Sequence, residues 1–316
     1  MKFAFAIFFC LGGLLWGQDS PLTGQRASTQ NEELVVHRGS PKLRAVIVQE
    51  GEDLLRSMAT IAGEPEGKPY PVVLEIHPAK EEAPSRIVRS FLTLPENENR
   101  YRLQVDLRLG AGESFDQENL RLVLLEMFII ERGLKSLPDG ERATLVEVPA
   151  WLLYGLMASL EWDEGKMDRR VYGSLLKSGG WMEVEKLVDQ KEIEKMDRLS
   201  RDLYRASTCA LVRAFLKQPK GKEAMAQLIS VVGVFEGEQI SLIQNHFSEV
   251  NLSRKGLERM WMLQVAAMAE SRLADAMTIA ETEAELKRGL YLLIPREDKT
   301  EKSPGLDEWA EVLDLE

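Results

Sequence analysis

Residues 115–132 restrict the fold most, because they would form a helix that is apolar on nearly every side. Apolar side chains are spread round this helix: Leu120, Val123, Leu124, Met127, Phe128 and Ile130. Such a helix is stable only when other elements cover most of its surface. The rest of the chain must therefore supply packing partners on several of its sides.

The region before this helix carries the pattern of a small sheet. Residues 72–76 form a short apolar run, and residues 86–94 carry the apolar side chains of Ile87, Val88, Phe91 and Leu92, as is typical of strands. Residues 42–48 contain β-branched side chains that favour another strand. Residues 101–109 alternate strictly between apolar and polar, which predicts an antiparallel strand with one buried face. Residues 53–62 have helical spacing instead.

The rest of the chain is dominated by helical patterns. They cover six segments, residues 151–160, 183–195, 199–217, 221–232, 240–247 and 253–273. We therefore predict an α+β fold, in which a small mixed or antiparallel sheet with a helix (residues 33–113) precedes a mostly helical part (residues 114–275). A helical tail is expected over residues 276–316.

The N-terminus has the features of a secretory signal. Lys2 precedes an apolar run at residues 3–16, which is shorter than the roughly 20 residues that a membrane span needs. We expect a signal peptide at residues 1–19 and a flexible leader at residues 20–32, with export to the periplasm or outside the cell. The alternative is an uncleaved membrane anchor, because Leu15 and Trp16 stand where cleavage favours small residues.

The charge of the chain disfavours two classes of partner. Its formal net charge is -11 and its pI is about 5.1. An acidic chain repels both phosphate backbones and anionic membrane surfaces. We expect no nucleic-acid partner and no membrane span after signal cleavage, while a protein or peptide partner stays open.

The segment after the buried helix carries a short motif. Residues 149–158 read Pro-Ala-Trp-Leu-Leu-Tyr-Gly-Leu-Met-Ala. Together with the preceding order of elements, this resembles the gluzincin zinc metallopeptidases, in particular the peptidase MA-like group, over residues 33–270. In that family the buried helix carries His-Glu-x-x-His, and the next helix carries Trp-Leu-x-Glu-Gly, whose Glu is the third zinc ligand. The resemblance implies a peptidase-like scaffold.

The residues that the resemblance aligns with the zinc ligands have the wrong chemistry. With Glu126 in the catalytic position, Leu125 and Ile129 replace both histidines, and with the register shifted by one residue Leu124 and Phe128 do. In either register Tyr154 replaces the ligand Glu. A catalytic zinc needs about three nitrogen, sulfur or carboxylate donors from the protein. The resemblance therefore implies a degenerate former site of six residues: Leu125, Glu126, Ile129, Trp151, Tyr154 and Gly155.

Histidines elsewhere in the chain do not provide a pair of zinc ligands on one helix. The three histidines, His37, His77 and His246, are never three or four residues apart. We expect each to be a surface or packing residue, and Glu126 to pair with an arginine such as Arg121. No metal, cofactor or catalytic residue is predicted.

We therefore expect a non-catalytic, exported pseudo-peptidase that serves binding or envelope structure. Leu125 and Ile129 should pack against the helix of Trp151, with Tyr154 covering the gap. Two alternatives stay open: a secreted hydrolase with an unrecognised non-zinc site, and an envelope scaffold anchored by its N-terminus.

The signal prediction has a direct test. Export should remove the N-terminus near Gln18, because the apolar run after Lys2 is too short to anchor the chain stably. Mass spectrometry of the protein from its own envelope fraction measures this. Intact residues 1–16 in the membrane pellet would support the anchored alternative instead.

Overall fold

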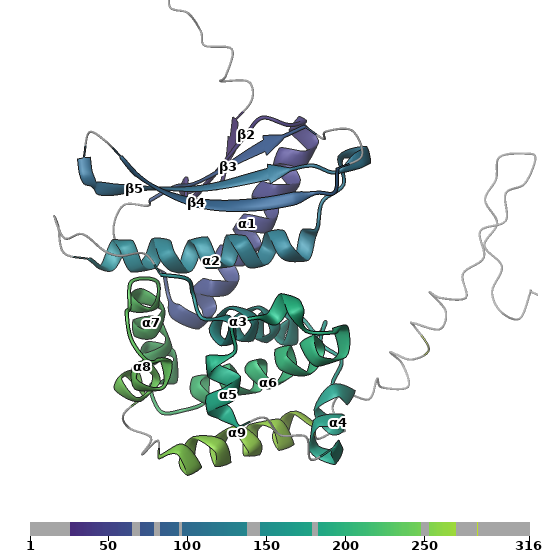
Figure 1. The fold of residues 1–316 in the computed structure, drawn as a ribbon, viewed down its shortest axis with the longest axis vertical. Coiled ribbons are helices and arrows are strands. Elements are labelled where there is room, and N and C mark those ends of the chain that lie inside the picture. Colours follow the sequence, from purple (N-terminus) through teal and green to yellow (C-terminus); the bar gives the residue numbers. More distant parts are fainter. Residues whose placement is uncertain are drawn as a thin grey trace, which may run out of the picture.

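The computed structural model describes residues 26–64, 70–78, 83–94, 97–137, 146–178, 183–247 and 253–269, together with Glu283. The expected signal at residues 1–19 and most of the tail expected at residues 276–316 lie outside them. Within the described residues the chain is α+β, as predicted, with a sheet on one side and a helical layer on the other (Figure 1). No helix of this part is long and apolar enough to cross a bilayer.

The described strands form one mixed sheet in the order β1-β2-β3-β5-β4. The central strands β2, β3 and β5 are parallel, whereas β1 and β4 pair antiparallel with their neighbours. The strands are β1 (Arg26–Ser28), β2 (Leu34–His37), β3 (Val72–His77), β4 (Arg86–Leu94) and β5 (Asn97–Arg108).

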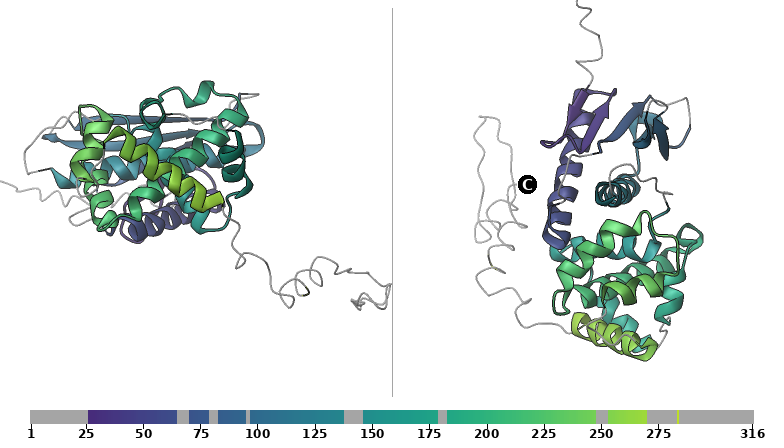
Figure 2. Two further views of the ribbon diagram at one scale, coloured as in Figure 1. Left: turned by 90° about the horizontal axis from the view of Figure 1, so that it is seen from below. Right: turned by 90° about the vertical axis from the view of Figure 1, so that its left-hand side faces the viewer.

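Alternation along β5 decides which face of the sheet is covered. Leu103, Val105 and Leu107 are fully buried, while Gln104 and Asp106 between them stay partly exposed. The buried face packs on α1 (Pro41–Ala62) and α2 (Gln117–Ser136). No described helix lies on the opposite face (Figure 2).

Helix α2 lies between the sheet and the helical layer (Figure 1). Every residue at positions 123–134 is buried, which confirms the prediction that this helix is covered on most sides. The helical layer contains α3 (Ala150–Asp163), α4 (Arg170–Ser178), α5 (Val184–Asp189), α6 (Arg198–Leu216), α7 (Gly221–Val232), α8 (Gln239–His246) and α9 (Arg254–Ala269).

The strand predicted at residues 42–48 is wrong, because this segment is the first half of α1. The Ser40 side chain caps the helix by accepting from the Leu43 backbone N–H, and Pro41 follows, where its fixed φ suits a helix start. Burial follows the helical period, since Ile47 is buried whereas Val46 is 43% exposed. Packing of one stripe against the sheet thus overrides the β propensity of these residues.

Two further details differ from the sequence-based expectations. Residues 26–28 of the expected flexible leader form β1, and β2 follows it, so the sheet begins before residue 33. The strand at residues 101–109 was expected to be antiparallel, but β5 pairs parallel with β3 and antiparallel with β4. A mixed sheet accommodates both.

The burial of α2 predicts the cost of truncating it. Ile129 is 0% exposed, so Ile129→Ala should lower the free energy of unfolding by about 2 to 5 kcal/mol, as for other core residues. Urea unfolding measures this loss. Leu199→Ala is the control, because Leu199 is 67% exposed. This variant should change the free energy of unfolding by no more than about 0.5 kcal/mol. Equal losses at both positions would contradict the described packing.

Candidate functional site

A pocket of about 330 Å³ opens between α2, α3, the edge strand β4 and the segment around α5. One stripe of α2 lines it, with residues three or four apart: Asn119, Leu122, Val123 and Glu126. One stripe of α3 faces this stripe: Ala150, Leu153 and Tyr154. The two helices therefore form opposing walls, and β4 contributes Arg89.

The structure divides the predicted site residues into two groups. Glu126 and Tyr154 both line the pocket. Leu125 and Ile129 are fully buried, as expected, but neither lines the pocket. The space beside Glu126 is therefore not filled by these two side chains, contrary to the expected closed cleft.

Trp151 and Gly155 hold α3 in place rather than lining the pocket. The Trp151 ring is fully buried and meets Phe215 of α6 edge-to-face, with 6.2 Å between ring centroids. At Gly155, a Cβ atom would lie only 2.7 Å from the Thr208 carbonyl oxygen and 2.7 Å from Val212 Cγ2. The glycine of the motif is thus required for the close packing of α3 on α6.

Glu126 is a buried carboxyl group at the inner end of the pocket. Its side chain is 2% exposed, and its Oε2 lies 2.7 Å from Arg89 Nη1. Arg89 also contacts the exposed Glu147, with 2.8 Å between Nη2 and Oε1. Burial raises the pKa of Glu126 to about 7, against the opposing effects of Arg89 and the Val148 backbone N–H.

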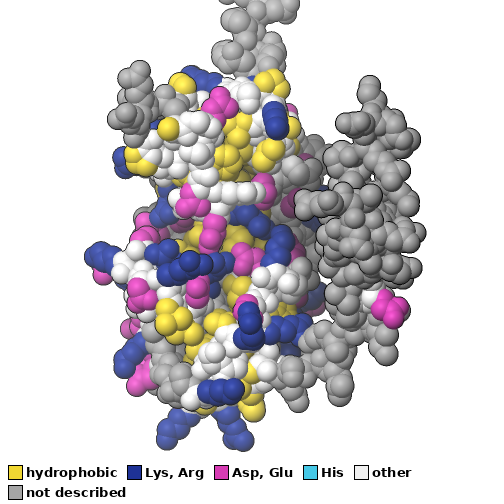
Figure 3. Space-filling model, turned by 90° about the vertical axis from the view of Figure 1, so that its right-hand side faces the viewer, with side chains coloured by type: hydrophobic (Ala, Val, Ile, Leu, Met, Phe, Trp, Pro, Cys, Tyr) yellow, Lys and Arg dark blue, Asp and Glu magenta, His cyan; other side chains and the backbone are white. Residues whose placement is uncertain are grey.

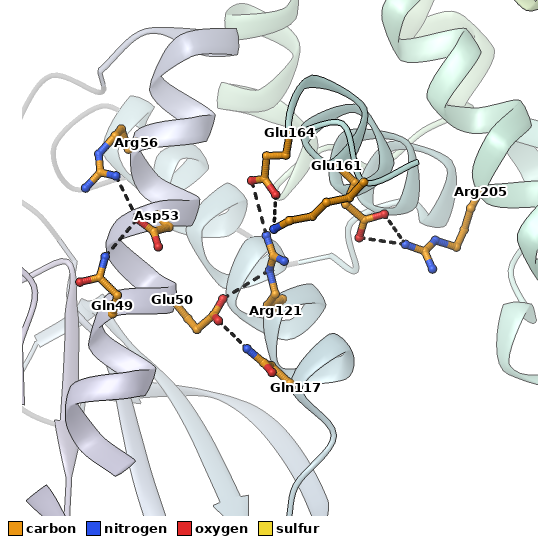
Figure 4. Close-up of polar contacts among 10 residues, drawn as sticks. Gln49, Glu50, Asp53, Arg56, Gln117, Arg121, Glu161, Glu164 and Arg205 are labelled. Atoms are coloured by element: carbon orange, nitrogen blue, oxygen red, sulfur yellow. Dashed lines mark hydrogen bonds and ion pairs between the residues drawn. The ribbon is translucent and has the colours of Figure 1, made fainter. Parts of the chain in front are cut away.

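Glu126 pairs with an arginine, as expected, but its partner is Arg89 and not Arg121. Arg121 instead lies 3.5 Å from Glu50 of α1 and 4.0 Å from Glu164 after α3 (Figure 4). Nearby, Arg205 of α6 makes a 2.7 Å contact with Glu161. These contacts connect the four helices α1, α2, α3 and α6 outside the pocket and leave Arg89 as the cation beside Glu126.

Charged side chains elsewhere on the surface are mixed in sign. Figure 3 shows lysines and arginines interspersed with acidic side chains across the middle of one face. Such a face presents no continuous basic surface to a phosphate backbone. It therefore offers no recognisable nucleic-acid footprint.

The pocket has carboxylates and apolar walls, but no three of its described side chains bring ligand atoms together as a zinc site requires. The described residues that line it include no histidine or cysteine. Within the part of the chain that the structure describes, one group of three His, Cys, Asp or Glu side chains has converging ligand atoms, Glu75, His77 and Asp106, and it lies on the sheet. Sequence reasoning missed Arg89 and the α5 side of the pocket, because only the tertiary structure brings them beside Glu126.

The pKa of Glu126 predicts a pH-dependent stability. A pKa raised from 4.5 to about 7 means that the folded chain holds this proton more tightly than the unfolded chain. Stability should therefore fall as the pH rises through this interval, and Glu126 should account for about 2 to 3 kcal/mol of the loss between pH 5 and pH 8.

Glu126→Gln should remove this component, because an amide does not titrate. Urea unfolding at both pH values measures the difference for wild type and variant. Glu147→Gln is the matched control, since Glu147 is 84% exposed. This variant should keep most of the wild-type change in unfolding free energy between pH 5 and pH 8. Equal changes for Glu126→Gln and wild type would contradict the raised pKa.

Comparison with known proteins adds no assignment to this geometry. No protein-family model matches the chain, and no curated protein matches its sequence.

Proposed function

We propose that this chain is a non-catalytic, exported binding protein on a gluzincin-like scaffold. Its pocket between α2 and α3 would receive a segment of a peptide or protein. One observation carries the proposal: the pocket keeps about 330 Å³ of open space beside Glu126 and Tyr154, and among the described residues no three His, Cys, Asp or Glu ligand atoms converge in it. That volume is near the lower end for ligand pockets, so it suits one or two side chains.

Under this proposal the pocket corresponds to the cleft of the peptidases, and the motif is then aligned with the residues of α2 that line the pocket. In His-Glu-x-x-His, all three functional residues face one cleft at positions i, i+1 and i+4. On α2 the pocket stripe contains Leu122, Val123 and Glu126 at this spacing. The two histidine positions then hold Leu122 and Glu126, rather than Leu125 and Ile129. One carboxylate with Tyr154 opposite does not make a zinc site, which supports a non-catalytic role.

The charges of the pocket indicate the class of ligand. Four acidic residues line it and two basic ones oppose them: Glu126, Glu147, Asp189 and Glu194 against Arg89 and Lys191. Apolar side chains complete the walls, among them Leu122, Val148, Leu153 and Ile193. This combination favours an amphipathic segment that carries a positive charge beside an apolar side chain.

One observation favours a second function, a hydrolase without zinc. A buried carboxyl group in a pocket with a pKa of about 7 is suited to general acid–base chemistry near neutral pH. In that case Glu126 would activate a water molecule. The described part of the lining supplies no Ser, Thr, Cys or His nucleophile beside it, so the binding role is the better supported.

A peptide-binding experiment tests the proposal. The probes are fluorescently labelled hexapeptides of alternating Leu and Lys, with alternating Leu and Glu as the charge control. Wild type should bind the Lys peptide in preference, and Ala150→Phe should weaken binding at least about tenfold by filling the pocket. Leu199→Phe is the matched control, because it adds the same side chain at an exposed position.

Three outcomes would count against this function. Binding that survives Ala150→Phe, or a preference for the Glu peptide, would contradict the pocket as the binding site. Cleavage of the peptide by wild type, detected by mass spectrometry and abolished by Glu126→Gln, would support the hydrolase instead.

A further inference from the structure

Three potential metal ligands converge on the helix-free face of the sheet. Glu75 and His77 lie on β3 and Asp106 on β5, and one ligand atom from each lies within 4.8 Å of the others. His77 Nε2 is 3.3 Å from Asp106 Oδ1. That is close to the separation of two neighbouring donors on one metal ion, whose bonds to each are about 2.0 to 2.2 Å long.

Strand register produces this convergence. Glu75 and His77 are two residues apart on β3, so their side chains share a face. The parallel pairing places Asp106 directly beside Glu75 and places His37, the last residue of β2, on its other side. The group therefore lies toward the carboxyl ends of three parallel strands.

This face is the reverse of the one that borders the pocket. Arg89 pairs with Val105, which is buried under the sheet, whereas the next residue along β5 is Asp106. Successive residues of a strand point to opposite faces. The cluster thus points away from Glu126, on the face that no described helix covers (Figures 1 and 2).

We propose that Glu75, His77 and Asp106 bind one divalent cation of the zinc class on this face. One imidazole and two carboxylates are donors that Zn²⁺ accepts, and three protein ligands leave a coordination position for water. The donors are partly withdrawn from solvent, with side chains 21%, 31% and 22% exposed in the order of their numbers. Gln104 donates to Asp106 Oδ1 at 2.9 Å and so orients this ligand.

Two arginines neutralise Glu75 in the structure and would compete with a cation. Arg102 Nη2 lies 3.4 Å from Glu75 Oε1, and Arg38 Nη1 lies 3.7 Å from Oε2. Both contacts are long, and both arginine side chains are about half exposed, so each can turn into water when a cation arrives. The proposal therefore requires that removing Arg102 strengthens metal binding.

Calorimetric titration of the full-length protein with Zn²⁺ tests the site, with the absorption spectrum of bound Co²⁺ as a second readout. Wild type should take up one ion per chain. His77→Ala should weaken binding at least about tenfold because it removes one of three donors, and the isosteric Asp106→Asn should do so because it replaces a charged carboxylate with a neutral amide. Arg102→Gln should tighten binding, an effect that general loss of structure cannot produce. His246→Ala, a half-buried histidine of α8, should bind as wild type does.

Several results would overturn the site. These are the absence of saturable uptake by wild type, uptake unchanged in both His77→Ala and Asp106→Asn, or weaker binding by Arg102→Gln. Loss of uptake in Glu126→Gln would place the ion in the pocket and would equally refute a site on the sheet. Because the peptide experiment probes a different face, the two proposals fail independently.

Discussion

The burial of α2 between two layers is the constraint on which the rest of the structure depends. A helix covered on all sides must also satisfy the polar groups that it carries. Glu131 does so through Lys135 at 2.8 Å and the Tyr70 backbone N–H at 2.9 Å. Arg132 donates to the Ala62 carbonyl oxygen at the end of α1. Glu126 differs from Glu131, because its counter-charge, Arg89, comes from the edge strand β4 and both Glu126 and Arg89 line the pocket.

Much of the fold follows from local patterns, because burial on one side imposes a period on the sequence. The alternation along β5 and the apolar surface of α2 identified both elements correctly. The strand prediction at residues 42–48 failed because β-branched side chains favour strands, whereas these residues belong to α1. Several of the elements that cover this helix, such as α2 and α7, lie far away in sequence. The short strands β1 and β2 each span three or four residues, too few to show a reliable period.

The residues of the two candidate sites were harder to predict than the elements that carry them. Glu126 and Tyr154 were identified, yet the face of α2 that borders the pocket depends on how the helix is rotated between its neighbours. On the sheet, a search for histidines one helical turn apart could not find His77, because its partners Glu75 and Asp106 meet it through strand pairing. Register between strands is a non-local property that spacing along one segment does not contain.

The contact at Gly155 decides which wall of the pocket can adapt to a ligand. Because α3 touches the backbone of α6 there, and α2 is enclosed by sheet and helices, neither of these walls can retreat without opening a packed interface. Strand β4, which contributes Arg89, is held by its pairing with β5 in the sheet. The remaining wall is built from residues around α5, a helix of only six residues followed by the short turn Ile193–Lys195. Induced fit would therefore be one-sided, with differences in ligand size absorbed by residues 188–194 while the position of Glu126 stays constant.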